Sequence, residues 1–286
     1  MAPARTAGFA RTFSVEGTRP SMDEIAQLGG ILPAGTQVYV TAVPTAAPDE
    51  TVAAATALRK TGLEPVVHIA ARRLASEAQL QDLLARLRGE ADTRRLLVIG
   101  GDIEATGPFA DALAVIQKGR LRDAGFEEIG IGAYPEGHPR IPLARLEASL
   151  DEKIASATAQ GLRVHIASQF SFSGERIIDW IKQMRAGGIT NQVKIGLAGP
   201  TSVPALIRYA KRCGVNASLR GLMSGAASAL IGNVGPDRII EVLGAAQGEL
   251  GDVHPHYFSF GGLVATARYA QEKAGAETAP AVATSR

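Results

Sequence analysis

Two residues that can exchange protons stand in short apolar segments of the N-terminal part of the chain. Glu16 closes the segment 12–16, and His68 lies in the segment 65–70. A carboxyl group that is partly buried among apolar residues has a raised pKa and can serve as a general acid. An ordinary strand-end glutamate and a hydrogen-bonded core histidine are the plainer interpretations. The elements that carry the two residues decide between these interpretations.

Two further segments carry groups that suit a flat heterocyclic ligand. Gly100, Gly101 and Asp102 follow one another at the end of the segment 95–101. Paired glycines let a ligand approach the backbone, and an aspartate accepts hydrogen bonds from a heterocycle. The alternative is a tight turn in which Asp102 caps the next helix. Gln169 offers a donor and an acceptor, and it shares strand parity with His165, so we expect both side chains to point into the fold.

The stretch 133–139, of sequence AYPEGHP, is the most specific in the chain. It places a ring at Tyr134, a carboxylate at Glu136 and an imidazole at His138. The two prolines of the stretch stiffen this loop. A bland turn rarely needs all of these groups, so we interpret the stretch as part of a binding or catalytic site.

Other reactive side chains form weaker patterns. His254 and His256 have no acidic or cysteine partner at metal-ligand spacing, so we predict that both are structural and that the chain holds no metal. Cys213 lacks the Cys–His pattern of a nucleophile. Lys194 is the one lysine within a predicted strand that could form a Schiff base.

These residues belong to a regular alternation of predicted strands and helices. Near-continuous apolar runs, typical of parallel strands covered on both faces, occupy 12–16, 37–42, 65–70, 95–101, 128–134, 163–170, 192–199 and 253–260. Helical patterns occupy 49–62, 76–90, 141–161, 173–188 and 202–213. We therefore predict an α/β fold, a (β/α)8 TIM barrel in a single domain, with an open doubly wound sheet as the alternative.

Composition bounds the classes of function. We expect an N-terminal extension over 1–10, the barrel over 11–274 and a disordered tail over 275–286. A net charge of +2 disfavours a nucleic-acid surface, and no apolar run is long enough to span a membrane. The start of the chain lacks the apolar stretch of a secretory signal, and the chain has 1 cysteine, so we expect a cytoplasmic protein.

Aromatic residues make up only 5% of the chain. We therefore expect an aliphatic core that extends into the barrel interior. Six of the rings fall at predicted strand ends, where a flat ligand would bind: Tyr134, Phe170, Phe172, Tyr257, Phe258 and Phe260. In TIM barrels the active site lies at the carboxyl ends of the strands, which is where Glu16, Thr41, His68, Asp102 and Gln169 are expected.

The ordered set of these motifs resembles the methylenetetrahydrofolate reductase family over most of the chain. It comprises Glu16, Val40-Thr41, His68, Gly101-Asp102, AYPEGHP (133–139), Gln169-Phe170, and Gly196 with Pro200. The chain is similar to the compact bacterial form, a catalytic barrel alone. The resemblance implies an oxidoreductase of one-carbon metabolism and methionine biosynthesis. It would reduce 5,10-methylenetetrahydrofolate to 5-methyltetrahydrofolate with NAD(P)H as cosubstrate and bound FAD.

The resemblance also implies roles for single residues. Glu16 would be the general acid that helps to open the folate imidazolidine ring, and hydride would then reach the iminium carbon through the flavin. Asp102 would lie beside pterin and flavin, Gln169 would hold the folate, and Phe260 would contact the substrate. The matching FAD-lining positions are Thr41, His68, Gly100, Gly101, Asp102, Tyr134, His138 and Lys153.

Four positions depart from the family pattern. Ala42 replaces an aromatic residue, Gly100 an arginine and Glu152 a basic residue, and Val203 or Pro204 stands where another ring is usual. Two of these changes remove positive charge from the expected diphosphate site, where Arg72, Arg73 and Lys118 are candidates to supply it.

Four hypotheses therefore stay open. The first is the FAD-linked reductase, and the second is a flavin-independent reductase with direct hydride transfer from NAD(P)H. The third is a non-catalytic folate- or flavin-binding barrel, and the fourth is an unrelated aldolase that uses Lys194. We expect tetrahydrofolate derivatives as partners, neither nucleic acid nor membrane, and the family also allows a homo-oligomer.

Overall fold

The computed structural model describes residues 8–43, 47–215 and 233–275. Its strands are β1 (Ser14–Gly17), β2 (Gln37–Val40), β3 (Glu64–Ala70), β4 (Arg95–Ile99), β5 (Glu128–Ala133), β6 (Arg163–Ser168), β7 (Val193–Ala198), β8 (Thr201–Ser202), β9 (Asn233–Val234) and β10 (Val253–Phe258). Its helices are α2 (Met22–Ile31), α3 (Pro48–Lys60), the 3-10 turn η1 (Ala71–Arg73), α4 (Glu77–Gly89), α5 (Ala112–Lys118), α6 (Leu143–Ala159), α7 (Gly174–Ala186), α8 (Val203–Cys213), α10 (Asp237–Leu250) and α11 (Leu263–Gly275).

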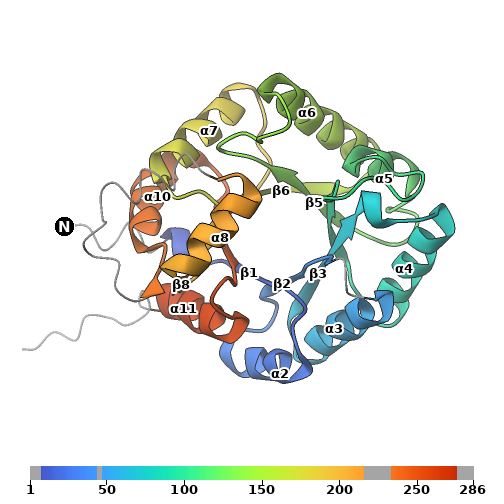
Figure 1. The fold of residues 1–286 in the computed structure, drawn as a ribbon, viewed down its shortest axis with the longest axis horizontal. Coiled ribbons are helices and arrows are strands. Elements are labelled where there is room, and N and C mark those ends of the chain that lie inside the picture. The colour runs from blue at the N-terminus through green and yellow to red at the C-terminus, as the bar shows by residue number, and fades with distance from the viewer. Residues whose placement is uncertain (1–7, 44–46, 216–232, 276–286) are drawn as a thin grey trace, which may run out of the picture.

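Parallel strands close into a barrel in the order β1-β10-β7-β6-β5-β4-β3-β2. The last strand along the chain pairs with the first: Ser14 stands opposite His256, and Glu16 opposite Phe258. Figure 1 shows the helices as a ring around the strands. The predicted (β/α)8 barrel is confirmed, and the closure between β1 and β10 excludes the open sheet.

Serine caps fix where several helices begin. Ser21 forms a capping box with Glu24 at the start of α2. Ser76 accepts a hydrogen bond from the Gln79 amide and starts α4 in the same way. Ser173 caps α7 through the amide of Arg176. These caps place the ends of the strand-to-helix loops, and the loops carry most of the candidate site.

The core between strands and helices is aliphatic, as predicted, but the barrel interior is not. The outer core contains Val15, Leu28, Ile69, Leu84 and many similar side chains. Inside the barrel the apolar cluster consists of Tyr39, Val66, Leu97 and Ala167, with Ile99 packed against it. Buried polar groups occupy much of the remaining interior: Ser14, Glu16, His68, Glu128, His165, Lys194 and His256. The prediction of an aliphatic barrel interior is therefore wrong.

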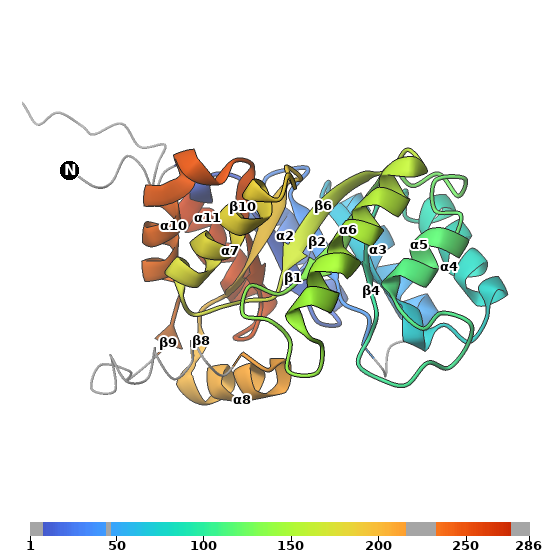
Figure 2. The same ribbon diagram turned by 90° about the horizontal axis from the view of Figure 1, so that it is seen from above.

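The C-terminal third contains elements that the sequence patterns did not predict. Helix α10, which packs on α7, is the barrel helix that follows β7, while the predicted helix α8 is an addition. Figure 2 shows α8 set apart from the helical ring, next to the two-stranded β8–β9 sheet. Elsewhere in the barrel, the sequence patterns also missed α2 and α5, and at its C-terminal end they missed α11.

The ends of the chain differ in part from the expected boundaries. Phe9 and Ala10 are buried in the outer core, although residues 1–10 were expected to be an extension. Helix α11 ends at Gly275, and the predicted tail beyond it lies outside the described residues. In the described part of the chain, no helix combines the length and apolarity needed to cross a membrane.

Candidate functional site

A cavity of about 1800 Å³ opens at the carboxyl ends of the barrel strands. Typical pockets for one small ligand measure roughly 300–1,000 Å³, so this cavity, which also runs along α7 to Met184 and Ile189, is larger than one small ligand needs. Most of the predicted site residues line it: Glu16, Thr41, His68, Gly100, Gly101, Asp102, Tyr134, His138, Lys153 and Gln169. Strands far apart in the sequence thus bring these residues to one mouth, as their strand-end positions predicted.

Glu16 lies at the centre of a buried polar cluster at the inner wall of this cavity. His256 Nε2 and His68 Nε2 each lie 3.2 Å from Glu16 Oε2. His256 Nδ1 is 2.9 Å from the Ser14 hydroxyl. We call Ser14, Glu16, His68 and His256 the mouth cluster. It joins one carboxylate to two groups that can carry a proton.

Burial alone would raise the pKa of Glu16, but the charge of His68 and a hydrogen bond from His256 lower it to about 2. Burial lowers the pKa of His256, and this effect outweighs the hydrogen bond to Glu16, which raises that pKa. A neutral His256 that donates from Nε2 to Glu16 must accept at Nδ1 from the Ser14 hydroxyl. The carboxyl is thus ionised, and any proton that it transfers is shared with the imidazoles.

His256 lines the cavity, where the sequence patterns did not place it. It was assigned a structural role because no metal partner had suitable spacing. Strand parity contains the missed signal, because His256 alternates with Phe258, and both line the cavity. Among the described residues, no group of three or more His, Cys, Asp or Glu side chains is arranged to hold a metal ion.

Asp102 is held at the rim by an arginine. Arg73 Nη2 lies 2.5 Å from Asp102 Oδ1, and the Asp102 side chain is 56% exposed. The hydrogen bond from Arg73, together with the charge of Arg212, lowers the pKa of Asp102 although partial burial opposes it. Gly101 has φ +94°, a backbone conformation that favours glycine, so its place in this turn depends on its lacking a side chain.

The AYPEGHP loop folds back on itself beside the cavity. The Gly137 amide donates to the Tyr134 carbonyl at 3.0 Å, and the Tyr134 and His138 rings meet edge to face at 5.1 Å. Burial raises the pKa of Tyr134 and lowers that of His138, to which the charge of Arg140 also contributes. The loop therefore presents a protonated phenol and an imidazole that favours its neutral form.

Helix α6 contributes the cation of Lys153. Lys153 Nζ donates to the Gly132 carbonyl at 3.4 Å, and burial lowers its pKa. Its neighbour Glu152 instead pairs with Arg145 at 3.0 Å. The negative charge that Glu152 brings in place of the family's basic residue is thus paired with the Arg145 guanidinium.

Phenylalanine side chains form one wall of the mouth. Phe258 lines the cavity, while Phe260 does not and stacks on Tyr209 of α8 with centroids 4.1 Å apart. Phe170 joins Phe172, Phe258 and Phe260 in edge-to-face contacts. Of the six rings expected at strand ends, Tyr134 and Phe258 line the cavity, whereas Phe170, Phe172 and Phe260 lie behind it. The prediction for Tyr257 is wrong, because its ring is buried in the outer core, edge to face with Phe13.

Gln169 is a polar residue of the cavity lining next to the phenylalanine side chains. Its Oε1 atom accepts a hydrogen bond from the Phe170 amide at 3.1 Å. His165, which shares its strand parity, is buried inside the barrel as expected.

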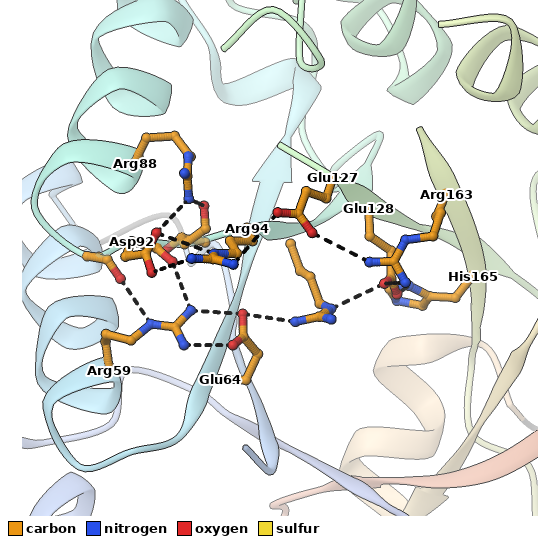
Figure 3. A network of polar contacts seen from close by, with 12 residues as sticks. Arg59, Glu64, Arg88, Asp92, Arg94, Glu127, Glu128, Arg163 and His165 are labelled. Carbon is orange, nitrogen blue, oxygen red and sulfur yellow. Dashed lines mark hydrogen bonds and ion pairs between the residues drawn. The ribbon is translucent and has the colours of Figure 1, made fainter. Parts of the chain in front are cut away.

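A second polar network closes the opposite end of the barrel. The Tyr39 hydroxyl lies 2.7 Å from His165 Nε2, and His165 Nδ1 lies 2.8 Å from Glu128 Oε1. Arg95 and Arg163 contact Glu128 at 3.2 and 3.4 Å. Figure 3 shows the continuation of this network through Glu64, Arg59, Asp92, Arg88, Arg94 and Glu127. We call it the base network.

Lys194 belongs to this interior region and does not line the cavity. It is buried, and its Nζ lies 5.9 Å from the centre of the Tyr39 ring. Burial is the main cause that lowers its pKa to about 8. Lys118, one candidate for binding a diphosphate, is also not among the lining residues, whereas Arg72 and Arg73 are.

The geometry agrees with comparisons with known proteins. The family model for methylenetetrahydrofolate reductase matches residues 11–220, most of the chain. The chain belongs to the methylenetetrahydrofolate reductase family. A 5,10-methylenetetrahydrofolate reductase of Pectobacterium carotovorum subsp. carotovorum is 26% identical over 152 residues. That match covers 53% of this chain and 49% of the relative, so the chain aligns with about half the length of that relative.

A solved structure shares the barrel fold of this methylenetetrahydrofolate reductase family member. Dihydropteroate synthase from Thermus thermophilus in complex with 6HMPPP gives a TM-score of 0.50 at 12% identity, over 93% of this chain and 92% of that one. A second structure of that enzyme gives 0.49 at 13% identity over the same shares. At such low identity the likeness extends to the fold alone.

Proposed function

We propose that the chain is a cytoplasmic methylenetetrahydrofolate reductase that interconverts 5,10-methylenetetrahydrofolate and 5-methyltetrahydrofolate, with NAD(P)H as cosubstrate and FAD as cofactor. The observation that carries this proposal is the mouth cluster, in which Glu16 and two histidines face a cavity larger than one small ligand needs. Family membership supplies the substrate class.

The mouth cluster can deliver the proton that this reaction needs. Protonation of the folate ring nitrogen breaks its bond to the methylene carbon and leaves an iminium ion, which a hydride then reduces to a methyl group. Glu16 would hold the proton at Oε2, supplied by His68 across 3.2 Å, while His256 would orient the carboxylate by its hydrogen bond. In the reverse direction the same carboxylate would take the proton back.

The rest of the mouth would bind and orient the ligands. Gln169 offers an amide to the folate, and Asp102 accepts hydrogen bonds at the rim. Phe258, packed against the buried ring of Phe170, would form an apolar wall that excludes water from the reacting atoms. These groups fix the distance between the two ligands, on which hydride transfer depends.

The cavity lining suits FAD in several respects. Tyr134 and His138 offer ring faces, and Lys153 and Arg72 offer cations. Arg73 has two nitrogens, Nε and Nη1, that are buried and have no hydrogen-bond partner in the described part of the chain. When bound, the flavin would supply a two-electron carrier between NAD(P)H and the folate.

The second candidate is a reductase with direct hydride transfer from NAD(P)H. Gly100 favours this second candidate, because a glycine at this position of the cavity lining places no cation where the FAD diphosphate would lie. The visible absorption spectrum of the purified protein separates the two candidates. A flavin band supports the first, and a colourless protein that turns over methyltetrahydrofolate without added FAD supports the second.

The role of Glu16 is tested by Glu16→Gln, with Glu147→Gln on α6 as a matched control in the cavity lining. Loss of a general acid costs about 10²- to 10⁴-fold in turnover. We expect that loss for Glu16→Gln, with the fold and folate affinity retained, and near-normal turnover for Glu147→Gln. Near-normal turnover in Glu16→Gln would overturn the assigned role.

A further inference from the structure

The loops that follow β3 and β4 are tied together at the rim of the cavity. The Arg72 amide donates to the Gly100 carbonyl at 3.0 Å. The Arg72 carbonyl accepts from the Thr106 amide at 2.9 Å and from the Thr106 hydroxyl at 3.0 Å. These backbone contacts hold the loop that carries Arg73 beside the loop that carries Asp102. The pairing of Arg73 with Asp102 is therefore supported by the backbone.

Arg73 has more hydrogen-bonding capacity than its partner uses. Its side chain is only 17% exposed, and Nη2 alone contacts Asp102. Nε and Nη1 are buried without a partner among the described residues. Buried donors without partners are unfavourable, and a guanidinium binds carboxylates and phosphates through two parallel hydrogen bonds. Arg73 is therefore suited to a larger anion than the one carboxylate oxygen that it contacts.

The surrounding charges also favour an anionic ligand. Arg72 and Arg212 line the same cavity as Arg73, and the charge of Arg212 lowers the pKa of Asp102. Asp111, another acid of the cavity lining, accepts a hydrogen bond from the Ala114 amide as the cap of α5. Arg73 contacts Asp102 and the charge of Arg212 acts on it, while Arg72 lines the same cavity and its Nε donates to the Ala110 carbonyl.

We propose that Arg73 binds the diphosphate of a dinucleotide, and that Asp102 occupies this arginine until a phosphate displaces it and frees its carboxylate for the second ligand. The identification of the ligand as a dinucleotide rests on the proposed function. The site also accounts for the glycine at position 100, because Arg73 supplies from the β3 loop the cation that the β4 loop lacks. Displacement makes the two ligands cooperative, since each favours the released form of Asp102.

Titration calorimetry with ADP, FAD and riboflavin tests the site without any measurement of turnover. Loss of a charged hydrogen-bonding pair costs about 10- to 100-fold in affinity. We expect Arg73→Ala to weaken ADP and FAD binding by that factor and to leave riboflavin, which has no phosphate, unchanged. Arg73→Lys keeps the charge but not the two parallel donors, and should give an intermediate loss. Arg176→Ala, in the cavity lining on α7 and outside this rim, is the matched control and should change none of the three.

Asp102→Asn gives the sharper test, because the proposal requires opposite effects on the two ligands. Removing the competing carboxylate should tighten ADP binding several-fold and weaken the binding of methyltetrahydrofolate. Weaker ADP binding in Asp102→Asn, or equal ADP affinity in Arg73→Ala and Arg176→Ala, would overturn the proposal. So would an Arg73→Ala variant that loses affinity for the folate and not for ADP, since Arg73 would then hold the glutamyl carboxylates.

The outcomes also separate this site from the proposed function. A protein that binds ADP through Arg73 but does not turn over methylenetetrahydrofolate retains the site and contradicts the reductase assignment. A reductase whose ADP affinity is insensitive to Arg73→Ala contradicts the site alone. Thermal melting of each variant, with and without ADP, shows that the differences do not arise from unfolding.

Discussion

Glu16 and Glu128 are both buried inside the same barrel, and each has a pKa lowered to about 2. Each contacts a histidine, His256 at 3.2 Å for Glu16 and His165 at 2.8 Å for Glu128. In each pair the histidine has a second partner, the Ser14 hydroxyl or the Tyr39 hydroxyl. The two ends of the barrel therefore hold the same kind of hydrogen-bonded glutamate.

The difference lies in the remaining neighbours. Glu128 contacts Arg95 and Arg163, whose charges do not change at any ordinary pH, and it does not line the cavity. Glu16 contacts only histidines among the basic groups of the described residues, and it lines the cavity. Arginines hold a carboxylate permanently ionised, whereas histidines let a proton move to it. The same low pKa therefore fits a structural role at the base network and the proposed proton transfer at the mouth cluster.

The largest expected effect comes from exchanging the two glutamates for glutamine. Glu128→Gln removes the carboxylate that Arg95 contacts inside the barrel, while Arg95 keeps Glu64 and Arg163 keeps Glu127. Breaking a largely buried pair such as Arg95–Glu128 costs about 3 kcal/mol of unfolding free energy. Glu16→Gln leaves only histidines without a carboxylate, and a histidine can lose its charge, so the loss of unfolding free energy should be smaller. Urea denaturation measures both values. A larger loss for Glu16→Gln than for Glu128→Gln would contradict the comparison.

The pH dependence of stability gives the next effect. Burial, opposed by the hydrogen bond to Glu128, lowers the pKa of His165 from 6.5 to about 4 in the folded protein. Between these values the unfolded chain binds a proton that the folded protein does not, so this contribution to stability is present above pH 6.5 and is lost as the pH falls toward 4.

Urea unfolding at a series of pH values between about 7 and 4 measures this loss, with a slope of about one proton expected. His165→Asn serves as the control, because its slope should be smaller whatever its absolute stability. A slope that is unchanged in His165→Asn would show that His165 binds its proton equally in both states.

The strands and most of the cavity-lining residues were predictable, because hydrophobic runs and strand ends are local features of the sequence. Closure of the barrel was predicted with an open sheet as the alternative, because the pairing of β1 with β10 joins residues near opposite ends of the chain. Glu16, Asp102 and Gln169 could be assigned to the mouth because the carboxyl ends of parallel strands meet there. Helix α10 and the additional helix α8 could not be assigned in the same way, because both follow β7 and only packing decides which one covers the barrel.

The polar interior was not predictable from composition. His165 crosses the barrel toward Tyr39 because Gly130 leaves space: a Cβ atom there would lie 2.5 Å from His165 Nε2. The partners of His256 and Arg73 also come from other strands or loops. Glu16 lies 240 residues from His256 in the sequence, and Asp102 lies 29 residues from Arg73. Pairings at such separations follow from barrel register, which hydrophobic patterns do not specify.

The smallest effect tests whether the two ends of the barrel act independently. Tyr39 belongs to the base network through its hydroxyl, but its ring also packs on His256 of the mouth cluster, with centroids 4.4 Å apart. Tyr39→Phe removes the hydroxyl and leaves His165 Nε2 without a donor, at a cost of about 1 kcal/mol in unfolding free energy.

The ring contact with His256 survives in Tyr39→Phe, so folate turnover should stay within about threefold of the unmodified protein, a difference below about 1 kcal/mol. A double-mutant cycle with His165→Asn isolates the hydrogen bond, because the Tyr39→Phe loss should shrink once His165 is gone. If turnover instead fell as far as in Glu16→Gln, the proton at Glu16 would depend on Tyr39 and His165. The mouth cluster and the base network would then form a single proton-carrying system through the barrel.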